Sequence, residues 1–388
     1  MKPKHTSAAE APYSFVLITL DNHVTGSVVR AAEKLAAEAP NLRVAVHAAA
    51  DWNSDEALER CRGDIRSADI LLVTMLFMEE HITAVLPDLQ ARRNECDAIV
   101  CCMCSSEVSK LTRMGRFSMD KEASGPIALL KRLRGKSDSR KGSAGAQQLS
   151  VLRRLPRILR FIPGTAQDLR VYFLAMQYWL AGSEENMRRL IALLVERYAG
   201  DDASSLRGKL TQGSPIDYPD VGLYDPDRKQ RISERPPSER QRGKPVVGTV
   251  GVLVMRSYAL AENTQHYDAV VRALRSRGLK VVTAFASGLD ARPAIEKYFV
   301  SDGEPSIDLL LSLTGFSLVG GPAYNDAHAA EELLTRLDVP YLAAHALEFQ
   351  SLEQWQASTH GLMPVESTMM VAIPELDGTY FNADYCSG

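Results

Sequence analysis

Residues 15–20 read Phe-Val-Leu-Ile-Thr-Leu and are followed at once by Asp21-Asn-His. This apolar run has the length of a buried strand, and the polar break after it is typical of a strand end. Apolar residues then recur at helical spacing over 24–39, and a second short run covers 43–47. The three segments predict a βαβ unit, which is the usual opening of a parallel sheet.

The same alternation of strands and helices continues along the chain and begins again after residue 245. The first part predicts helices over 55–66 and 79–93 and strands over 70–73 and 98–101. The second part predicts strands over 246–254, 280–285, 307–311 and 341–344, and helices over 265–277, 291–299 and 324–337. The predicted fold class is therefore α/β, with two doubly wound (Rossmann- or flavodoxin-like) domains and an added helical segment.

The added helical segment is marked by residues typical of helix ends. Thr165 together with Asp168 predicts an N-terminal cap, and Gly182 predicts the end of that helix. Ser183 predicts the cap of a further helix that runs to Tyr198.

The domain boundaries follow from a change in composition. Apolar periodicity is lost after residue 200, and prolines interrupt a polar stretch up to residue 244. We therefore expect an N-terminal domain over 13–200, a linker over 201–244 and a second domain over 245–378, followed by a separate tail over 379–388.

A basic segment precedes the added helices. Ten Lys or Arg residues and the single acid Asp138 lie between residues 131 and 160. Within 149–162, apolar residues at helical spacing alternate with arginines, and two interpretations stay open. The helix packs by its apolar stripe with its arginines in water, or it makes peripheral contact with an anionic membrane surface or an acidic partner.

The overall composition narrows the class of protein. Hydrophobic residues make up 45% of the chain and charged residues 24%, which is typical of a globular protein. A formal net charge of −3 argues against nucleic acid as the main partner. The polar first twelve residues lack the core of a signal peptide, and no later run reaches the ~18 apolar residues that span a bilayer. We expect a cytoplasmic protein.

Two kinds of cofactor chemistry are disfavoured. Gly135-Lys-Ser resembles the end of a phosphate-binding loop, but Leu130 stands where the first glycine is required, so ATP hydrolysis must come from elsewhere.

Four of the six cysteines are crowded together (Cys96, Cys101, Cys102 and Cys104). Their spacing matches neither zinc nor iron–sulfur motifs, so small buried hydrophobes are favoured over a soft-metal site, and we expect no disulfides.

The candidate ligand site lies after a strand of the second domain. Residues 314–323 contain Gly320-Gly-Pro and lead into a helix, at the sheet edge where open α/β folds bind ligands. Backbone N–H groups there could hold a carboxylate or a phosphate, although glycines before a proline more often form a tight turn. His266, after the Met255-Arg-Ser-Tyr loop, is a candidate ligand or base, and His23 is its equivalent in the first domain.

A series of local strings resembles the large porphyrin-binding subunit of magnesium chelatase, in the same order along nearly the whole chain. The strings are Phe117-Ser-Met119, Gly142-Ser-Ala-Gly145, Gln177-Tyr-Trp-Leu180, His266-Tyr267, Glu296-Lys-Tyr-Phe-Val300, Leu313-Thr-Gly-Phe316, Val319-Gly-Gly-Pro-Ala323, Leu337-Asp-Val-Pro-Tyr341 and Ile373-Pro-Glu-Leu-Asp-Gly378.

The resemblance implies a subunit that binds protoporphyrin IX. With two AAA-type partner subunits that hydrolyse ATP, this family inserts Mg²⁺ on the route to chlorophyll or bacteriochlorophyll. We predict that Arg256, His266, Phe316, Gly320 and Gly321 bind the substrate, with no catalytic residue and no bound metal in this part. A location in the cytoplasm or peripherally at a photosynthetic membrane would follow.

This chain departs from the family pattern at several positions. After the glycine turn it reads Tyr324-Asn-Asp-Ala327, where only Asp326 keeps its place, and Tyr258 stands where histidine is common. Residues 379–388 do not continue the pattern. We expect a truncated N-terminal part that is inactive alone; a non-catalytic tetrapyrrole-binding or regulatory module and a cobaltochelatase-type subunit are the alternatives.

Overall fold

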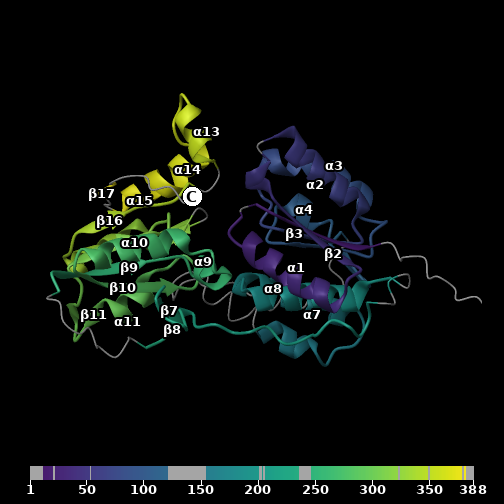
Figure 1. The fold of residues 1–388 in the computed structure, drawn as a ribbon, viewed down its shortest axis with the longest axis horizontal. Coiled ribbons are helices and arrows are strands. Elements are labelled where there is room, and N and C mark those ends of the chain that lie inside the picture. Colours follow the sequence, from purple (N-terminus) through teal and green to yellow (C-terminus); the bar gives the residue numbers. More distant parts are fainter. Residues whose placement is uncertain are drawn as a thin grey trace, which may run out of the picture. The chain divides into compact units, whose positions relative to one another are not determined.

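The computed structural model describes residues 12–20, 22–52, 54–120, 154–200, 203, 206–235, 246–321, 324–347, 350–377 and 380–381. The described residues form two compact units, one ending at Ile216 and the other beginning at Asp217 (Figure 1).

The first unit is built on a six-stranded sheet. Its strands are β1 (Tyr13–Thr19), β2 (Leu42–Ala48), β3 (Ile70–Thr74), β4 (Ala98–Cys102), β5 (Arg113–Met114) and β6 (Phe117–Ser118). The order is β2-β1-β3-β4-β5-β6, in which β1 to β4 are parallel, as predicted, and the two short edge strands are antiparallel. All seven residues of β1 are buried, which explains the apolar run of residues 15–18 at its centre.

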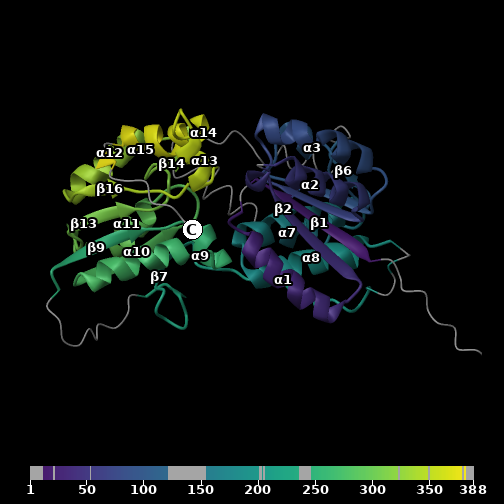
Figure 2. The same ribbon diagram turned by 45° about the horizontal axis from the view of Figure 1, so that its top comes forward.

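Helices cover both faces of this sheet (Figure 2). They are α1 (Thr25–Glu38), α2 (Asp55–Ser67), α3 (Glu79–Arg92), α4 (Ser106–Ser109), α7 (Thr165–Ala181) and α8 (Glu184–Tyr198). Helices α2 and α3 pack together on one face, and α8 packs with α1 and α7 on the other. The doubly wound prediction is confirmed for this unit.

The predicted cap of α7 is wrong, whereas the signals at its end are correct. Gly164 occupies the N-cap position, and no side chain caps the helix. Asp168 is buried and accepts hydrogen bonds from the Arg116 backbone N–H and the Tyr198 hydroxyl, so a tertiary contact uses the carboxylate. Gly182 ends α7 in the left-handed conformation, and the Ser183 hydroxyl caps α8 through the Asn186 N–H.

The second unit has a seven-stranded sheet in the order β17-β16-β13-β9-β10-β7-β8. The strands are β7 (Val221–Tyr224), β8 (Ile232–Ser233), β9 (Gly248–Leu253), β10 (Leu279–Ala286), β13 (Leu309–Ser312), β16 (Tyr341–Ala343) and β17 (Tyr380–Phe381). Five neighbouring strands, β17 to β10, are parallel, and the β7–β8 hairpin adds antiparallel to β10. Part of the expected linker is therefore an edge of this sheet; the strands are too short to show a periodicity.

Two apolar cores lie on opposite faces of the second sheet. Helices α9 (Arg256–Ala261) and α10 (Gln265–Ser276) pack into one core, and α11 (Arg292–Tyr298) and α12 (Ala327–Leu337) pack into the other. Two small hairpins, β11–β12 (Val300–Ser301 and Glu304–Pro305) and β14–β15 (Gly320–Gly321 and Tyr324–Asn325), accompany them. The predicted helix over 324–337 thus starts three residues late, because Tyr324 and Asn325 pair with the glycines.

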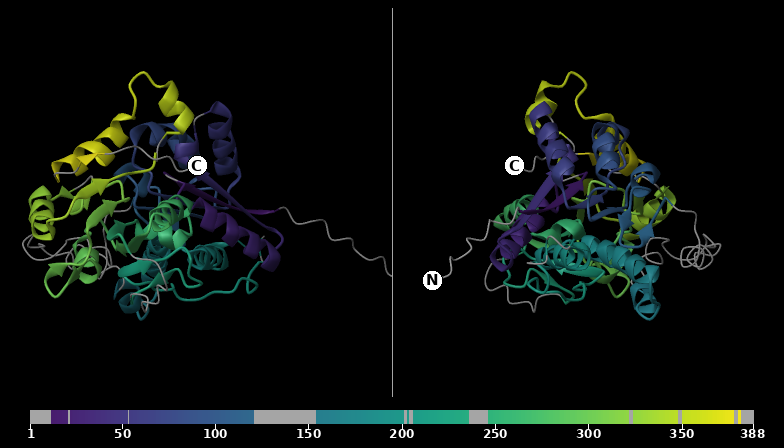
Figure 3. Two further views of the ribbon diagram at one scale, coloured as in Figure 1. Left: turned by 60° about the vertical axis from the view of Figure 1, so that its left-hand side comes forward. Right: turned by 90° about the vertical axis from the view of Figure 1, so that its right-hand side faces the viewer.

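A helical run follows β16. It contains α13 (Leu352–Ala357), α14 (Pro364–Glu366), a π-helical turn at Ser367–Ala372 and α15 (Ile373–Leu376). Figure 3 shows this run in yellow from two further sides. It leads to Asp377, whose carboxylate holds the glycine-containing loop.

Candidate functional site

The candidate site is the carboxyl edge of the second sheet. Leu253, the last residue of β9, pairs with Ser312, the last residue of β13. The loops that follow these strands therefore leave the same edge, one carrying Arg256 and the other Phe316. This is the edge at which open parallel sheets bind ligands.

Arg256 begins α9 and is held against the chain that enters the second unit. Its Nε donates to the Pro219 carbonyl at 2.9 Å and its Nη2 to the Tyr218 carbonyl at 3.1 Å. The guanidinium thus stabilises the approach to β7, in addition to standing near the candidate site.

His266 lies in the first turn of α10, within a small aromatic cluster. Its ring centroid is 3.9 Å from that of Tyr267 and 5.5 Å from that of Tyr258, which meets it edge-on. Burial lowers the pKa of His266 to about 4, so the imidazole is neutral at physiological pH. A neutral imidazole can accept a hydrogen bond or ligate a metal, but it holds a proton poorly.

The pKa of His266 predicts a pH dependence of stability. Since the folded-state pKa is about 4 and the ordinary value is 6.5, the unfolded chain binds the proton more readily. The contribution is complete above about pH 6.5 and is lost as the pH falls toward 4. We expect the free energy of unfolding to fall by about 2 kcal/mol more in the parent than in His266→Gln between pH 7 and 4.5, allowing for the partly exposed ring. Urea unfolding of both proteins at both pH values measures this difference. An equal fall in the free energy of unfolding in the parent and in His266→Gln would remove His266 as the cause.

The loop after β13 passes close to two other segments. Gly315 has a φ of +69°, and a Cβ there would lie 3.5 Å from His345 Cβ and 3.7 Å from Met370 Cγ. Glycine is suited to this left-handed turn. Phe316, the next residue, is half-buried.

The paired glycines form a hairpin. Gly320 and Gly321 pair antiparallel with Asn325 and Tyr324. The Gly320 N–H donates to the Leu289 carbonyl at 2.6 Å, so this group is already used within the protein. The tight-turn interpretation therefore describes Gly320 better than an anion cradle does.

Asp326, the residue that keeps its place in the family pattern, has a structural role in this turn. Its side chain accepts from the Ala329 N–H and caps α12. An N-cap carboxylate stabilises the first turn of a helix.

Asp377 is a residue that sequence reasoning missed as part of this site. Its side chain is only 2% exposed, and it accepts from the Ser317 hydroxyl at 2.9 Å and from the Leu318 N–H at 2.8 Å. Burial is the largest influence and raises the pKa of Asp377, while both hydrogen bonds oppose it. The only available signal was its place in the family-like string 373–378, since the contact spans 59 residues of sequence.

The other residues singled out from the sequence lie in the first unit. His23 stands in the turn between β1 and α1 and is half-buried. Cys96, Cys101 and Cys102 are buried, and burial raises the pKa of each thiol, as expected for small core side chains. Among the described residues, no group of three or more His, Cys, Asp or Glu side chains converges on a common point.

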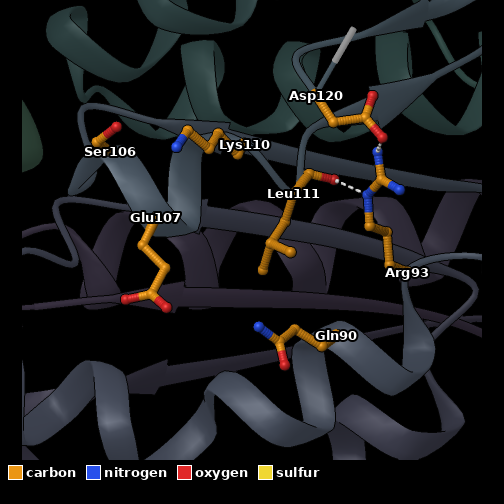
Figure 4. A pocket seen from close by; sticks show the side chains of 7 residues that line it. All are labelled: Gln90, Arg93, Ser106, Glu107, Lys110, Leu111 and Asp120. Atoms are coloured by element: carbon orange, nitrogen blue, oxygen red, sulfur yellow. Dashed lines mark hydrogen bonds and ion pairs between the residues drawn. The ribbon is translucent and has the colours of Figure 1, made fainter.

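A pocket of about 560 Å³ opens on the first unit (Figure 4). It is lined by Gln90, Arg93, Ser106, Glu107, Lys110, Leu111 and Asp120. Arg93 donates to the Leu111 carbonyl at 3.1 Å and pairs with Asp120 at 2.8 Å. The lining carries both signs of charge, and it contains none of the residues predicted from the sequence.

No helix among the described residues has the length and apolar character needed to cross a bilayer.

Comparison with known families divides the chain into two matches. Residues 14–173 match a domain of unknown function, DUF3479. Residues 176–383 match the CobN/Magnesium Chelatase family, which covers more than half of the chain.

Individual relatives agree with this family. The chain is 50% identical to the magnesium-chelatase H subunit of Cereibacter sphaeroides and 51% identical to that of Rhodobacter capsulatus, in each case over 94% of this chain and 30% of the relative. The catalytic subunit of cobaltochelatase from Mycobacterium tuberculosis is a structural match, with a TM-score of 0.45 and 18% identity over 96% of this chain and 24% of that one.

The chain thus spans about 30% of the length of the curated relatives that it matches. Both the family match and the near-complete alignment of this chain with the H subunits confirm the resemblance seen in the sequence strings. The chain belongs to the CobN/magnesium chelatase family and is a homologue of the N-terminal portion of the magnesium-chelatase H subunit.

Proposed function

We propose that this chain is a tetrapyrrole-handling part of magnesium chelatase, which acts with the remainder of the H subunit and two AAA-type ATPase subunits to insert Mg²⁺ into protoporphyrin IX in (bacterio)chlorophyll biosynthesis. The observation that carries the proposal is the 50% and 51% identity to two H subunits over 94% of this chain.

The chemistry of the reaction explains why several subunits would share it. Mg²⁺ gives up its bound water reluctantly, and the macrocycle loses two pyrrole protons when the metal enters. Insertion therefore needs basic groups, a shaped cavity and a source of energy. Since this sequence lacks a phosphate-binding loop, the proposal assigns ATP hydrolysis to the partner subunits.

The proposed substrate contacts are Arg256, His266, Phe316, Gly320 and Gly321, and their surroundings support them unequally. A neutral His266 beside Tyr258 offers an aromatic surface and a nitrogen suited to accepting a hydrogen bond or binding a metal. Phe316 offers a half-buried ring. Gly320 and Arg256 have backbone partners, so we expect them to shape the site more than to bind charge.

A second candidate function is a tetrapyrrole-binding or regulatory module without insertion activity. Such a module would keep affinity for a tetrapyrrole or a partner without inserting a metal. A cobaltochelatase-type role would replace Mg²⁺ with cobalt on a related macrocycle. We favour the first two functions over it because the chain is 50% and 51% identical to two H subunits.

Titration of protoporphyrin IX into the purified chain, followed by absorbance, tests the proposal. We expect saturable binding, and we expect His266→Gln to raise Kd about tenfold, as for the loss of one good contact. His328→Gln is the matched control, because His328 is exposed on α12. An unchanged circular dichroism spectrum shows that each variant folds as the parent does.

Addition of the ATPase subunits, Mg²⁺ and ATP then separates the two functions. Metallated porphyrin supports the chelatase role, and binding without metallation supports the module. Absence of binding by the parent chain would overturn both.

A further inference from the structure

A basic and apolar patch lies on the first unit, just before α7. It consists of Arg154, Arg157, Ile158, Arg160, Phe161 and Ile162, and all six side chains are exposed. The Phe161 ring is 83% exposed and Ile158 is 56% exposed. Large apolar side chains clustered at the surface usually mark a contact with another molecule.

The patch is held firmly against the unit. Leu155 and Leu159 point inward and are buried. The Gln167 side-chain amide donates to the Leu159 carbonyl at 2.9 Å and to the Ile162 carbonyl at 2.5 Å. Arg170 Nε donates to the Pro156 carbonyl at 3.1 Å. The backbone is thus anchored on α7, and the exposure of Phe161 is a property of the folded segment.

Several arginines of this unit pair with carboxylates. Arg62 pairs with Asp88, and Arg188 pairs with Glu185. Within the part of the chain that the structure describes, no ion pair joins Arg154, Arg157 or Arg160 to a carboxylate. Three arginines therefore lie within seven residues of the exposed Phe161 along the chain, without an ion pair to the described surface.

We propose that the basic and apolar patch binds the surface of an anionic lipid bilayer, a function separate from tetrapyrrole binding. Arginine guanidinium groups pair well with phosphate headgroups. Phe161 and Ile158 would enter the boundary between headgroups and acyl chains, as apolar residues of interfacial helices do. The patch comprises one short segment, whereas a stable protein interface usually needs about 20–30 residues on each side. This difference favours a lipid surface over an acidic protein.

Flotation of the full chain with lipid vesicles tests the proposal. At low salt we expect binding to vesicles of phosphatidylcholine and phosphatidylglycerol, and little binding to phosphatidylcholine alone. Phe161→Ser is expected to lower the partition coefficient at least about tenfold. The triple change Arg154→Gln, Arg157→Gln and Arg160→Gln is expected to lower it about a hundredfold, at roughly fivefold for each charge.

A second triple change provides the matched control. Arg60→Gln, Lys209→Gln and Lys229→Gln remove the same charge from exposed positions outside the patch. This variant should bind anionic vesicles within about twofold of the parent, with all variants checked for folding by circular dichroism. Failure of the parent to float with anionic vesicles, or equal losses in the two triple variants, would overturn the proposal. Binding to polyglutamate without binding to vesicles would assign an acidic protein partner in its place.

Discussion

Asp377→Ala is expected to lower the free energy of unfolding of the second unit by about 3 kcal/mol. The change removes a buried acceptor and leaves the Ser317 hydroxyl and the Leu318 N–H without their carboxylate partner. Because both groups are buried, each one loses its hydrogen bond without full access to water. Urea unfolding followed by circular dichroism measures the loss of stability. Hydrogen exchange in peptides of the second unit shows whether the transition belongs to that unit.

Two further variants make this prediction specific. Asp377→Asn keeps an acceptor for Leu318 and removes a buried charge, so it should cost less than half as much as alanine. Glu375→Ala is the control, since Glu375 is exposed on α15, two residues away; its effect should stay within about 0.5 kcal/mol. Faster exchange at 315–321 in Asp377→Ala alone would show that the carboxylate holds the loop, and unchanged exchange there would contradict this role.

Gly251→Val should destabilise the second unit by about 3 kcal/mol, through overpacking. Gly251 lies in β9 between β10 and β13, and a Cβ there would come within 2.8 Å of Ile307 Cδ1 and 3.1 Å of the Phe299 ring. Both neighbours are buried, so neither can move into solvent. Thermal and urea unfolding would measure the change.

A double-mutant cycle identifies the contact responsible. Gly251→Ala introduces only the Cβ, and Ile307→Val removes the Cδ1 atom that it would meet. We expect the double variant to be about 1 kcal/mol more stable than the sum of the single changes predicts. Strict additivity would mean that another contact causes the strain.

The predicted fold and the observed fold agree where a segment carries its own pattern. Strands β1, β3 and β4 are buried throughout, so each contains at least four consecutive apolar residues, a run that can be recognised without tertiary information. Gly182 and Ser183 were also predicted correctly, because a left-handed helix end and a hydroxyl cap are local devices. The two-residue strands β5, β6 and β8 are too short to carry such a signal.

Residues of the candidate site were predictable only in part. The topology placed Arg256 and Phe316 at one sheet edge, since adjacent parallel strands end together. Whether those residues and His266 contact a tetrapyrrole stays a prediction. The identity of the family came from ordered strings, and the comparisons confirmed it.

The amino-acid sequence was enough to establish the two alternations of strands and helices and the family of the chain. Both depend on periodicity and local strings, which are properties of neighbouring residues. The polar groups that support the site became apparent only in the folded chain. Asp377 accepts a hydrogen bond from Ser317, 60 residues away in the sequence. Asp168 does not take part in the expected helix cap and instead accepts hydrogen bonds from Arg116 and Tyr198. A buried carboxylate is stabilised by donors that folding brings to it, and their distance along the chain leaves no pattern in the sequence.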